Sequence, residues 1–318
     1  MVALGAAAIV GVGLVAAFLL KQKDQEKHKA RIMQLIQKMT EHGVLMKNPS
    51  MTASKLSRFV ASGPQALAVT TDFDRTMTGA NSVSAHGVIE CADVLSSAYC
   101  ERSKELFDKY YKIECDPNMS MEEKLPFMRE WYESNHDATI KEGLQLSMIK
   151  TAVAQNVENN SLHMRSGAID LYGRLQAAGV PLLVFSAGLA NVIEEVLEQK
   201  CGAIAPTTRV VANRMMFDKS GLLVSYSEPL IHMFNKNAAA VGPVEGPHRP
   251  CHLLLGDSMG DLTMCDGADP PPSVLLKVGF LNLHVDKNRE RYMDGYDLVI
   301  PNDGSMDPVL DILSELGL

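Results

Sequence analysis

The sequence predicts an α/β protein in which a mainly parallel sheet carries an inserted all-helical cap. From about residue 160 to the C-terminus, short apolar runs alternate with helical patterns and are joined by short links. Such alternation is typical of a parallel sheet covered by helices. Between about 85 and 160 the patterns are helical, with no convincing strand. Short polar motifs follow several of the apolar runs, as expected where parallel strands end at one edge of a sheet.

The strands follow from apolar runs that are short and bounded by turn residues. The first covers 66–71 and ends directly at a pair of aspartates. Further strands are expected at 181–185, 209–212, 251–255, 273–279 and 297–300, with a hairpin over 216–224.

Helices are expected where apolar residues recur at three- and four-residue spacing. In chain order they cover 21–48, 101–111, 121–135, 140–155, 167–178 and 189–199, and another starts near Asp261.

These patterns divide the chain into parts. Residues 1–20 are a candidate membrane anchor, and residues 21–50 are a helical lead-in. Residues 51–84 and 160–318 together form the core, and residues 85–159 form the helical cap. The cap is interpreted as an insertion because it separates the first strand that carries a motif from the second.

The composition is that of an ordinary globular protein. The 318 residues are enough to bury a sizeable core, with 46% hydrophobic and 21% charged residues. The formal net charge of -8 argues against a nucleic acid polymer as partner, because binding to a phosphate backbone normally requires a basic surface. The six cysteines form no Cys-x-x-Cys pair and no zinc-like spacing, so reduced thiols are expected rather than disulfides.

The N-terminus begins with an uncharged run rich in Ala, Val, Leu and Gly from residue 2 to residue 20, followed by Lys21 and Lys23. Its length is at the lower limit for a spanning helix. No positive segment precedes it, which argues against a cleaved secretory signal. By the positive-inside rule, an anchor here would leave the rest of the chain in the cytoplasm. A buried or frayed N-terminal helix of a soluble protein is the alternative.

Asp72 and Asp74 directly follow the first strand. A carboxylate at this position can attack phosphorus and form an aspartyl-phosphate, which splits hydrolysis into two easier steps. A second carboxyl group two residues on can protonate the leaving oxygen and later activate water. We therefore assign Asp72 as the nucleophile and Asp74 as the general acid and base. For this pair taken alone, a turn or a simple metal site is the alternative.

Two further groups suit the binding of a phosphate. Ser186 follows the strand 181–185 and precedes Ala187, Gly188 and a helix, so its hydroxyl and the nearby backbone N–H groups could cradle a phosphate. A helix N-cap is the alternative role of this serine. Lys236 is expected to neutralise negative charge on the nucleophile and the phosphate in the transition state. A solvated surface lysine is the alternative for Lys236.

A glycine-containing turn after a later strand brings Asp257 and Asp261. Mg²⁺ prefers oxygen ligands and retains water and phosphate oxygens. The carboxylates of Asp72 and Asp257 and the backbone carbonyl of Asp74 fit that description. Asp261, together with Thr76, is expected to orient these groups rather than to bind the metal itself. A glycine-rich surface turn is the alternative.

Longer stretches are more specific than these short motifs. They cover residues 71–74, 110–117, 122–124, 130–132, 185–188, 230–236 and 255–258. On these stretches, from about Ile36 to the C-terminus, the sequence resembles the haloacid dehalogenase (HAD) superfamily of phosphatases. Within that superfamily it is most similar to the cytosolic 5′-nucleotidase III, or pyrimidine 5′-nucleotidase, family.

This resemblance implies a HAD-like Rossmannoid core with a helical cap, dependence on Mg²⁺, and nucleoside 5′-monophosphates as substrates. The cap glutamate of the family, which contacts the edge of the base or sugar, aligns with Glu114. A neutral cap residue near the base, a serine in other members, aligns with Asn135. The sequence departs from the family there and in the loop 75–90, where Arg75 replaces an apolar residue. The base preference and the substrate range therefore stay open.

The residues themselves also suit a base. Trp131 and Tyr132 could stack on a flat ring, an interaction worth about 1–3 kcal/mol per base. Glu114 could accept hydrogen bonds from an exocyclic amine, which favours cytosine or a guanine-type edge over uracil. Packing between helices is the alternative for the aromatic residues, and a surface carboxylate is the alternative for Glu114.

These features predict a cytoplasmic, Mg²⁺-dependent 5′-nucleotidase. Nucleoside 5′-monophosphates such as CMP, UMP or 7-methyl-GMP would be hydrolysed through an aspartyl-phosphate, which another nucleoside could intercept in place of water. One alternative keeps the chemistry and changes the substrate to a small phosphomonoester such as phosphoserine. Another is a membrane-tethered binding protein with an inactive core. A decayed site usually lacks at least one essential group, whereas this chain retains Asp72, Asp74, Ser186, Lys236 and Asp257.

Overall fold

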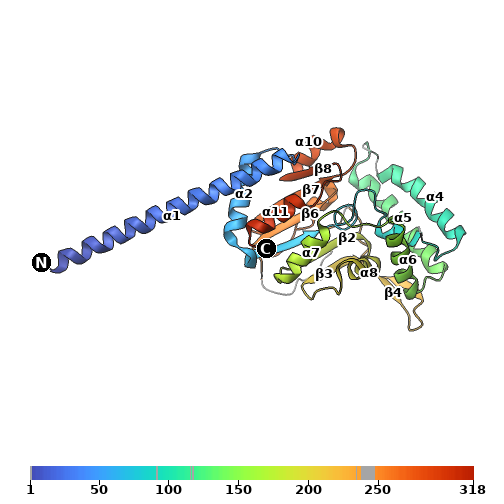
Figure 1. Cartoon of the computed structure of the whole chain (residues 1–318). Helices are drawn as coiled ribbons and strands as arrows, with labels where there is room; N and C mark the ends of the chain where they lie inside the picture. The colour runs from blue at the N-terminus through green and yellow to red at the C-terminus, as the bar shows by residue number, and fades with distance from the viewer. Residues whose placement is uncertain (1, 91, 115, 117, 234, 238–247) are drawn as a thin grey trace.

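A six-stranded parallel sheet forms the centre of the protein (Figure 1). The computed structural model describes residues 2–318 apart from 91, 115, 117, 234 and 238–247, and it describes residues 2–20 and 121 by their backbone only. In their order across the sheet, the strands are β3 (Thr208–Asn213), β2 (Leu182–Leu189), β1 (Leu67–Thr71), β6 (Cys251–Gly256), β7 (Val274–Leu281) and β8 (Leu298–Pro301). The predicted α/β core with a parallel sheet is confirmed.

The position of β1 explains why the predicted motifs meet. β1 lies between β2 and β6, and Thr71 at its end is opposite both Val184 and Leu255. Because the three strands are parallel and in this register, the residues that follow them emerge at the same edge of the sheet.

Both faces of the sheet are buried. On β6, Leu253 and Leu255 belong to the large hydrophobic core, whereas Leu254 between them packs into a smaller cluster with Phe185 and Tyr296. This explains why the strands appear in the sequence as continuous apolar runs rather than as alternating ones.

As expected, free thiols are found at the cysteines that the structure describes, Cys100, Cys201, Cys251 and Cys265.

Helices connect and cover the strands. Those of the core are α1 (Val2–Glu41), α2 (Pro49–Ser62), α7 (Ala168–Ala177), α8 (Ala190–Cys201), α10 (Val285–Gly295) and α11 (Asp307–Glu315), with short 3₁₀ turns η1 (Pro64–Ala66) and η2 (Met259–Thr263). The sequence analysis assigned no element to the residues of α2, α10 and α11. Between β1 and β2 lie α3 (Ala85–Glu90), α4 (Ser97–Glu114), α5 (Met121–Lys141) and α6 (Leu146–Glu158).

Three of the predicted helices are wrong in their extent. The helix expected over 21–48 ends at Glu41, because Gly43 adopts a left-handed φ of 83° and Leu45 bridges to Val299. The helix expected over 140–155 is interrupted, because Gly143 adopts a left-handed φ of 73° after α5 and Gln145 bridges to Leu222 before α6 begins. The helix expected from Asp261 is only the 3₁₀ turn η2. A stretch rich in Gly and Pro at 267–272 follows this turn and does not continue a helix.

The helices α3 to α6, between β1 and β2, fall into two groups. Val88 of α3 and Val153 of α6 belong to the same large core as the sheet. In α4 and α5, Leu106, Tyr110 and Met128 form a separate small cluster. We therefore propose that α4 and α5 form the outer part of the expected cap and that α3 and α6 connect it to the core.

A small antiparallel hairpin of β4 (Met215–Phe217) and β5 (Leu223–Tyr226) lies beside α5. Its residue Tyr226 stacks on His136 of α5 with ring centroids 3.6 Å apart. The hairpin, which follows β3 in the chain, thus supports the cap helix from the core.

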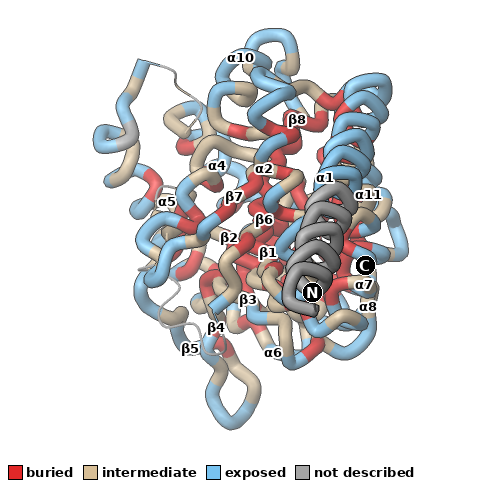
Figure 2. Tube along the Cα trace, turned by 90° about the vertical axis from the view of Figure 1, so that its left-hand side faces the viewer, coloured by how far each residue is buried: buried red, intermediate tan, exposed pale blue. Residues whose placement is uncertain are grey.

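Helix α1 packs on the core through its C-terminal half, where Ile32, Leu35, Ile36 and Met39 are buried (Figure 2). Among the helices of the described part of the chain, none is both long and apolar enough to cross a membrane. The predicted anchor at 2–20 lies outside the residues whose side chains the structure describes.

Candidate active site

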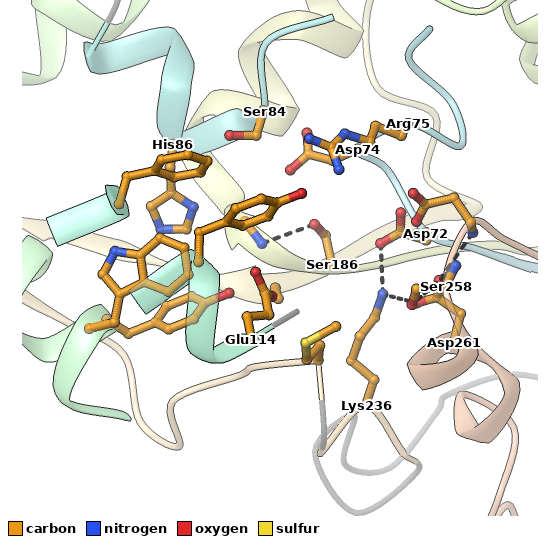
Figure 3. A pocket seen from close by; sticks show the side chains of 18 of the residues that line it. Asp72, Asp74, Arg75, Ser84, His86, Glu114, Ser186, Lys236, Ser258 and Asp261 are labelled. Atoms are coloured by element: carbon orange, nitrogen blue, oxygen red, sulfur yellow. Dashed lines mark hydrogen bonds and ion pairs between the residues drawn. The ribbon is translucent and has the colours of Figure 1, made fainter. Parts of the chain in front are cut away.

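The predicted catalytic groups line one cavity at the carboxyl edge of the sheet (Figure 3). Asp72 and Asp74 follow β1, and Asp257 follows β6. Ser186 lies in β2, at the start of an irregular stretch where the pairing with β3 shifts register. The cavity has a volume of about 270 Å³, and α4 and α5 form its other wall.

Lys236 lies at the centre of this group. Its ammonium donates to Asp72 Oδ1 at 2.6 Å and to Asp261 Oδ1 at 2.5 Å, and all three side chains are buried. Burial disfavours the charged amine, yet the carboxylates of Asp261 and Asp72 raise the pKa of Lys236 above its usual value. The lysine is therefore a permanent positive charge beside the Asp72 carboxylate, and its burial does not fit the alternative of a solvated surface lysine.

The two carboxyl groups of the first motif have different environments. Burial raises the pKa of Asp72 to about 6, and Lys236 opposes this shift. Burial, assisted by the nearby Asp72 carboxylate, raises the pKa of Asp74 to about 7. The Asp74 carboxyl also accepts a hydrogen bond from the backbone N–H of Ala85 at 2.9 Å. Near neutral pH one carboxyl is ionised more readily than the other, as a nucleophile and a general acid require.

Ser186 is buried, and its hydroxyl accepts a hydrogen bond from the N–H of Gly188 at 3.0 Å. The residue at the N-cap of α8 is Leu189, so Ser186 is not a simple helix cap. A Cβ at position 188 would lie 2.8 Å from the Cβ of Ala85 and 3.3 Å from Asp74 Oδ2. Only glycine allows this turn to approach the Asp74 loop so closely.

Asn213 connects this turn to the loop that carries Lys236. Its side-chain amide donates to the carbonyls of Ala187 and Ile231, each at 2.8 Å, and accepts from the N–H of Ile231 at 2.8 Å. Asn213 was not among the predicted site residues, because an asparagine at the end of a strand has no local feature that indicates such a bridge.

The acidic residues form a group that fits a divalent cation. Carboxylate oxygens of Asp72, Asp257 and Asp261 all lie within 4.8 Å of one another. Asp261 already accepts from Lys236, from the N–H groups of residues 257 and 258, and from the Ser258 hydroxyl, as expected for an orienting residue.

Asp257 lies close to the carboxylates of Asp72 and Asp261. Burial and the neighbouring carboxylates of Asp72 and Asp261 raise its pKa well above the usual value. A bound cation would offset this repulsion, and hard oxygen donors of this kind suit Mg²⁺.

Asp74 contributes only a backbone carbonyl to the predicted ligand set. Thr76 is fully buried, and its backbone carbonyl accepts from Arg165 Nε at 2.8 Å.

The cap side of the cavity carries the residues expected to contact a base. Glu114, Trp131 and Asn135 all line it, together with the aromatic side chains of Phe107, Tyr111 and Tyr132. Burial raises the pKa of Glu114, while Arg75 and Lys124 oppose the shift. Trp131 Nε1 and Asn135 Oδ1 are buried and have no hydrogen-bond partner among the described residues. These atoms are thus available to a bound molecule.

Arg75 and His86 are among the residues of the cavity wall that were not predicted as site residues. Arg75 directs its side chain into the cavity beside Asp74, and His86 of α3 lies at its cap side (Figure 3). Burial lowers the pKa of His86 to about 4, so this imidazole is neutral near pH 7.

Comparison with known proteins agrees with this geometry. The model of the pyrimidine 5′-nucleotidase (UMPH-1) family matches residues 70–317. The chain belongs to this family. The predicted 5′-nucleotidase activity is thereby confirmed at the level of the reaction class.

The chain is also similar to individual members. The 7-methylguanosine phosphate-specific 5′-nucleotidase A of Xenopus laevis is 35% identical over 279 residues, which cover 85% of this chain and 94% of that protein. The human 7-methylguanosine phosphate-specific 5′-nucleotidase is 34% identical over 284 residues, covering 86% and 92%. The crystal structure of cytosolic 5′-nucleotidase IIIB bound to cytidine superposes with a TM-score of 0.78 at 29% identity, covering 89% of this chain and 97% of that one.

Proposed function

We propose that the protein hydrolyses nucleoside 5′-monophosphates through an aspartyl-phosphate on Asp72, with Mg²⁺ as cofactor. The observation that carries this proposal is the buried triad of Asp72, Lys236 and Asp261 beside Asp74, facing an aromatic wall on the cap. The core supplies groups for phosphoryl transfer, and the cap supplies a surface for a flat base.

In the first step, a carboxylate oxygen of Asp72 attacks phosphorus, and the bond between phosphorus and the 5′-oxygen breaks. Asp74 donates its proton to that oxygen, so the nucleoside leaves as an alcohol. A pKa of about 7 leaves Asp74 partly protonated at neutral pH, as this step requires.

In the second step, Asp74 accepts a proton from water, and the water oxygen attacks the phosphorus of the aspartyl-phosphate. The bond to Asp72 breaks, and inorganic phosphate leaves. A second nucleoside could take the place of water and receive the phosphoryl group instead. In both steps Lys236, the Ser186 hydroxyl and the backbone of the turn 186–188 stabilise the charge on the phosphoryl oxygens.

The residues that would hold Mg²⁺ are Asp72, Asp257 and the backbone carbonyl of Asp74. When bound, the ion would neutralise phosphate charge and orient the phosphoryl group.

The cap favours a base that offers hydrogen-bond donors and a positive ring. Glu114 is a partly buried acceptor, and the aromatic rings of Trp131, Tyr111 and Tyr132 line the same cavity. The 7-methylguanine ring carries a positive charge and donor groups on its edge, and a cation is attracted to aromatic faces. Because relatives that share about a third of the sequence are named for 7-methylguanosine phosphate, we propose 7-methyl-GMP and CMP as better substrates than UMP.

A cytoplasmic location for the catalytic part is proposed on the name of a relative, the putative cytosolic 5′-nucleotidase 3 of Caenorhabditis elegans, which is 33% identical. Attachment through residues 2–20 remains a prediction. Deleting these residues and comparing membrane and soluble fractions tests it, since an anchored protein would move to the soluble fraction.

The activity test measures phosphate release with and without Mg²⁺ from 7-methyl-GMP, CMP, UMP, AMP and phosphoserine. We expect release from the nucleotides, its loss with a chelator, and its loss in Asp72→Asn. Asp266→Asn, at an exposed aspartate, is the matched control and should keep full activity. Equal rates on phosphoserine and nucleotides would contradict the substrate class, and an active Asp72→Asn enzyme would contradict the nucleophile.

A further inference from the structure

The cavity contains a positive charge that the proposed chemistry does not use. Arg75 lies on the loop after β1, next to Asp74, and its guanidinium points into the cavity (Figure 3). Within the part of the chain that the structure describes, this guanidinium forms no hydrogen bond or ion pair, whereas Lys236 is shared by two carboxylates. Arg75 is therefore available to bind an anionic group.

The backbone of Arg75 is held firmly in place. Its φ of 58° lies in the left-handed region, which residues with a Cβ rarely adopt. The N–H donates to Thr78 Oγ1 at 2.7 Å, and the carbonyl accepts from Asn282 Nδ2 at 2.9 Å and from Arg165 Nη2. Glycine would adopt this conformation without strain, so the backbone does not explain an arginine here.

The surroundings of the guanidinium show where it lies in the site. It lowers the pKa of Asp74, Asp257 and Glu114, against the larger opposing effect of burial on each. These carboxyl groups belong to the loop after β1, to the end of β6 and to α4 of the cap. Arg75 thus lies between the core and the cap, on the side of the general acid.

We propose that Arg75 is a substrate-binding residue that holds the phosphate of the nucleotide from the side of its leaving oxygen. The proposal rests on the proposed function, because Asp74 defines that side by protonating the 5′-oxygen. Lys236 approaches the phosphate from the side of Asp72, so the two cations hold it from different directions. A guanidinium can donate two parallel hydrogen bonds to phosphate oxygens, which a single ammonium cannot do with the same geometry.

The test is the affinity of the folded protein for inorganic phosphate, measured by titration calorimetry in Mg²⁺-containing buffer. Arg75→Met and Arg75→Gly should each weaken phosphate binding by about tenfold to hundredfold, the range for a hydrogen bond to a charged group. Arg75→Lys should restore part of the affinity. Cytidine, which carries no phosphate, should bind all variants within about twofold of wild type.

Arg75→Gly removes the side chain and relieves the strain, so it separates the guanidinium from the backbone. Arg289→Met, at an exposed arginine of α10, is the matched control and should leave phosphate binding unchanged. Thermal midpoints verify that each variant is folded.

Unchanged phosphate affinity in Arg75→Met and Arg75→Gly overturns the proposal, as does wild-type protein that binds no phosphate. An equal loss of cytidine and phosphate affinity also overturns it, because Arg75 would then act through the cap. Binding is measured without turnover, so a protein that binds phosphate through Arg75 but hydrolyses no nucleotide would refute the proposed function alone.

Discussion

At the residue scale, the site depends on how burial and charge separate the properties of neighbouring carboxyl groups. Asp72 is paired with Lys236, whereas among the described residues the Asp74 carboxyl accepts a hydrogen bond only from the N–H of Ala85. The pKa of Asp74 is the higher of the two, at about 7 against about 6. Adjacent positions on one loop can therefore act as nucleophile and proton donor at the same pH.

The first prediction concerns the pH dependence of kcat/KM on a nucleotide. Asp72 must be ionised, so activity falls below about pH 6, and Asp74 must be protonated, so activity falls above about pH 7. Bound Mg²⁺ favours the ionised form of Asp72 and moves the acid limb to lower pH.

Asp74→Asn provides the control for the alkaline limb. The variant is assayed on p-nitrophenyl phosphate, whose leaving group departs without protonation. The fall in kcat/KM at alkaline pH should be absent there. A limb near pH 7 that persists in this variant would exclude Asp74 as its source.

The second prediction concerns the base. Glu114→Gln keeps the size of the side chain and removes the charge of a partly buried acceptor, so kcat/KM for 7-methyl-GMP should fall by about tenfold to hundredfold. Glu122→Gln, at an exposed position of α5, is the matched control. Turnover of p-nitrophenyl phosphate, which has no base, should change by less than about twofold. An equal loss on both substrates would mean that Glu114 supports the fold rather than the base.

At the scale of elements, a buried arginine ties the loop after β1 to the ends of β7 and β8. The Arg165 guanidinium donates to the carbonyls of Thr76 and Gly304, both at 2.8 Å, and to Asp303 Oδ1 at 2.9 Å. Its side chain is 1% exposed and lies over the ring of Phe280. This clamp holds the loop that carries Asp72 and Asp74.

The third prediction follows from this clamp. Arg165→Met leaves several buried carbonyls without donors, so we expect a loss of about 3–5 kcal/mol in the free energy of unfolding, measured with urea. Arg174→Met removes an arginine whose salt bridge to Asp170 is partly exposed, and it should cost less than about 1 kcal/mol. Similar losses in the free energy of unfolding in the two variants would show that Arg165 stabilises the fold no more than a partly exposed arginine does.

At the scale of the whole molecule, the cap and the core meet through the hairpin of β4 and β5 as well as through the chain connections. The ring of Tyr226 stacks on His136 of α5 with an interplanar angle of 5°. Gln145, at the start of α6, forms a bridge with Leu222. The position of α5 over the cavity thus depends on a segment that follows β3.

The fourth prediction tests this support. Tyr226→Ala removes a stacked pair worth about 0.5–1.5 kcal/mol, so the KM for a nucleotide should rise by about twofold to tenfold because α5 is held less firmly. Val224→Ala, at an exposed position of the same strand, should leave the KM unchanged. A KM for the nucleotide that stays constant in Tyr226→Ala would show that the stack does not position the cap.

Much of the fold could be predicted because its signals are local. The apolar runs of β1, β2 and β6 and the polar residues after them are contiguous in the sequence. The extent of α6 and the short turn η2 could not be predicted, since the bridge of Gln145 to Leu222 and the hydrogen bonds of Asp261 depend on tertiary contacts. The amphipathic helices α2, α10 and α11 were not assigned at all.

The sequence by itself determined the reaction class, because Asp72, Asp74, Ser186 and Asp257 each lie in a motif that a strand end positions. Only the tertiary structure decided which isolated residues meet. Lys236 contacts Asp72 across 164 positions of the chain, and Arg165 reaches Thr76 across 89. No local pattern encodes such contacts, because they exist only once the sheet has brought its strand ends together. For the same reason, the direction of the Arg75 side chain became evident only in the folded protein.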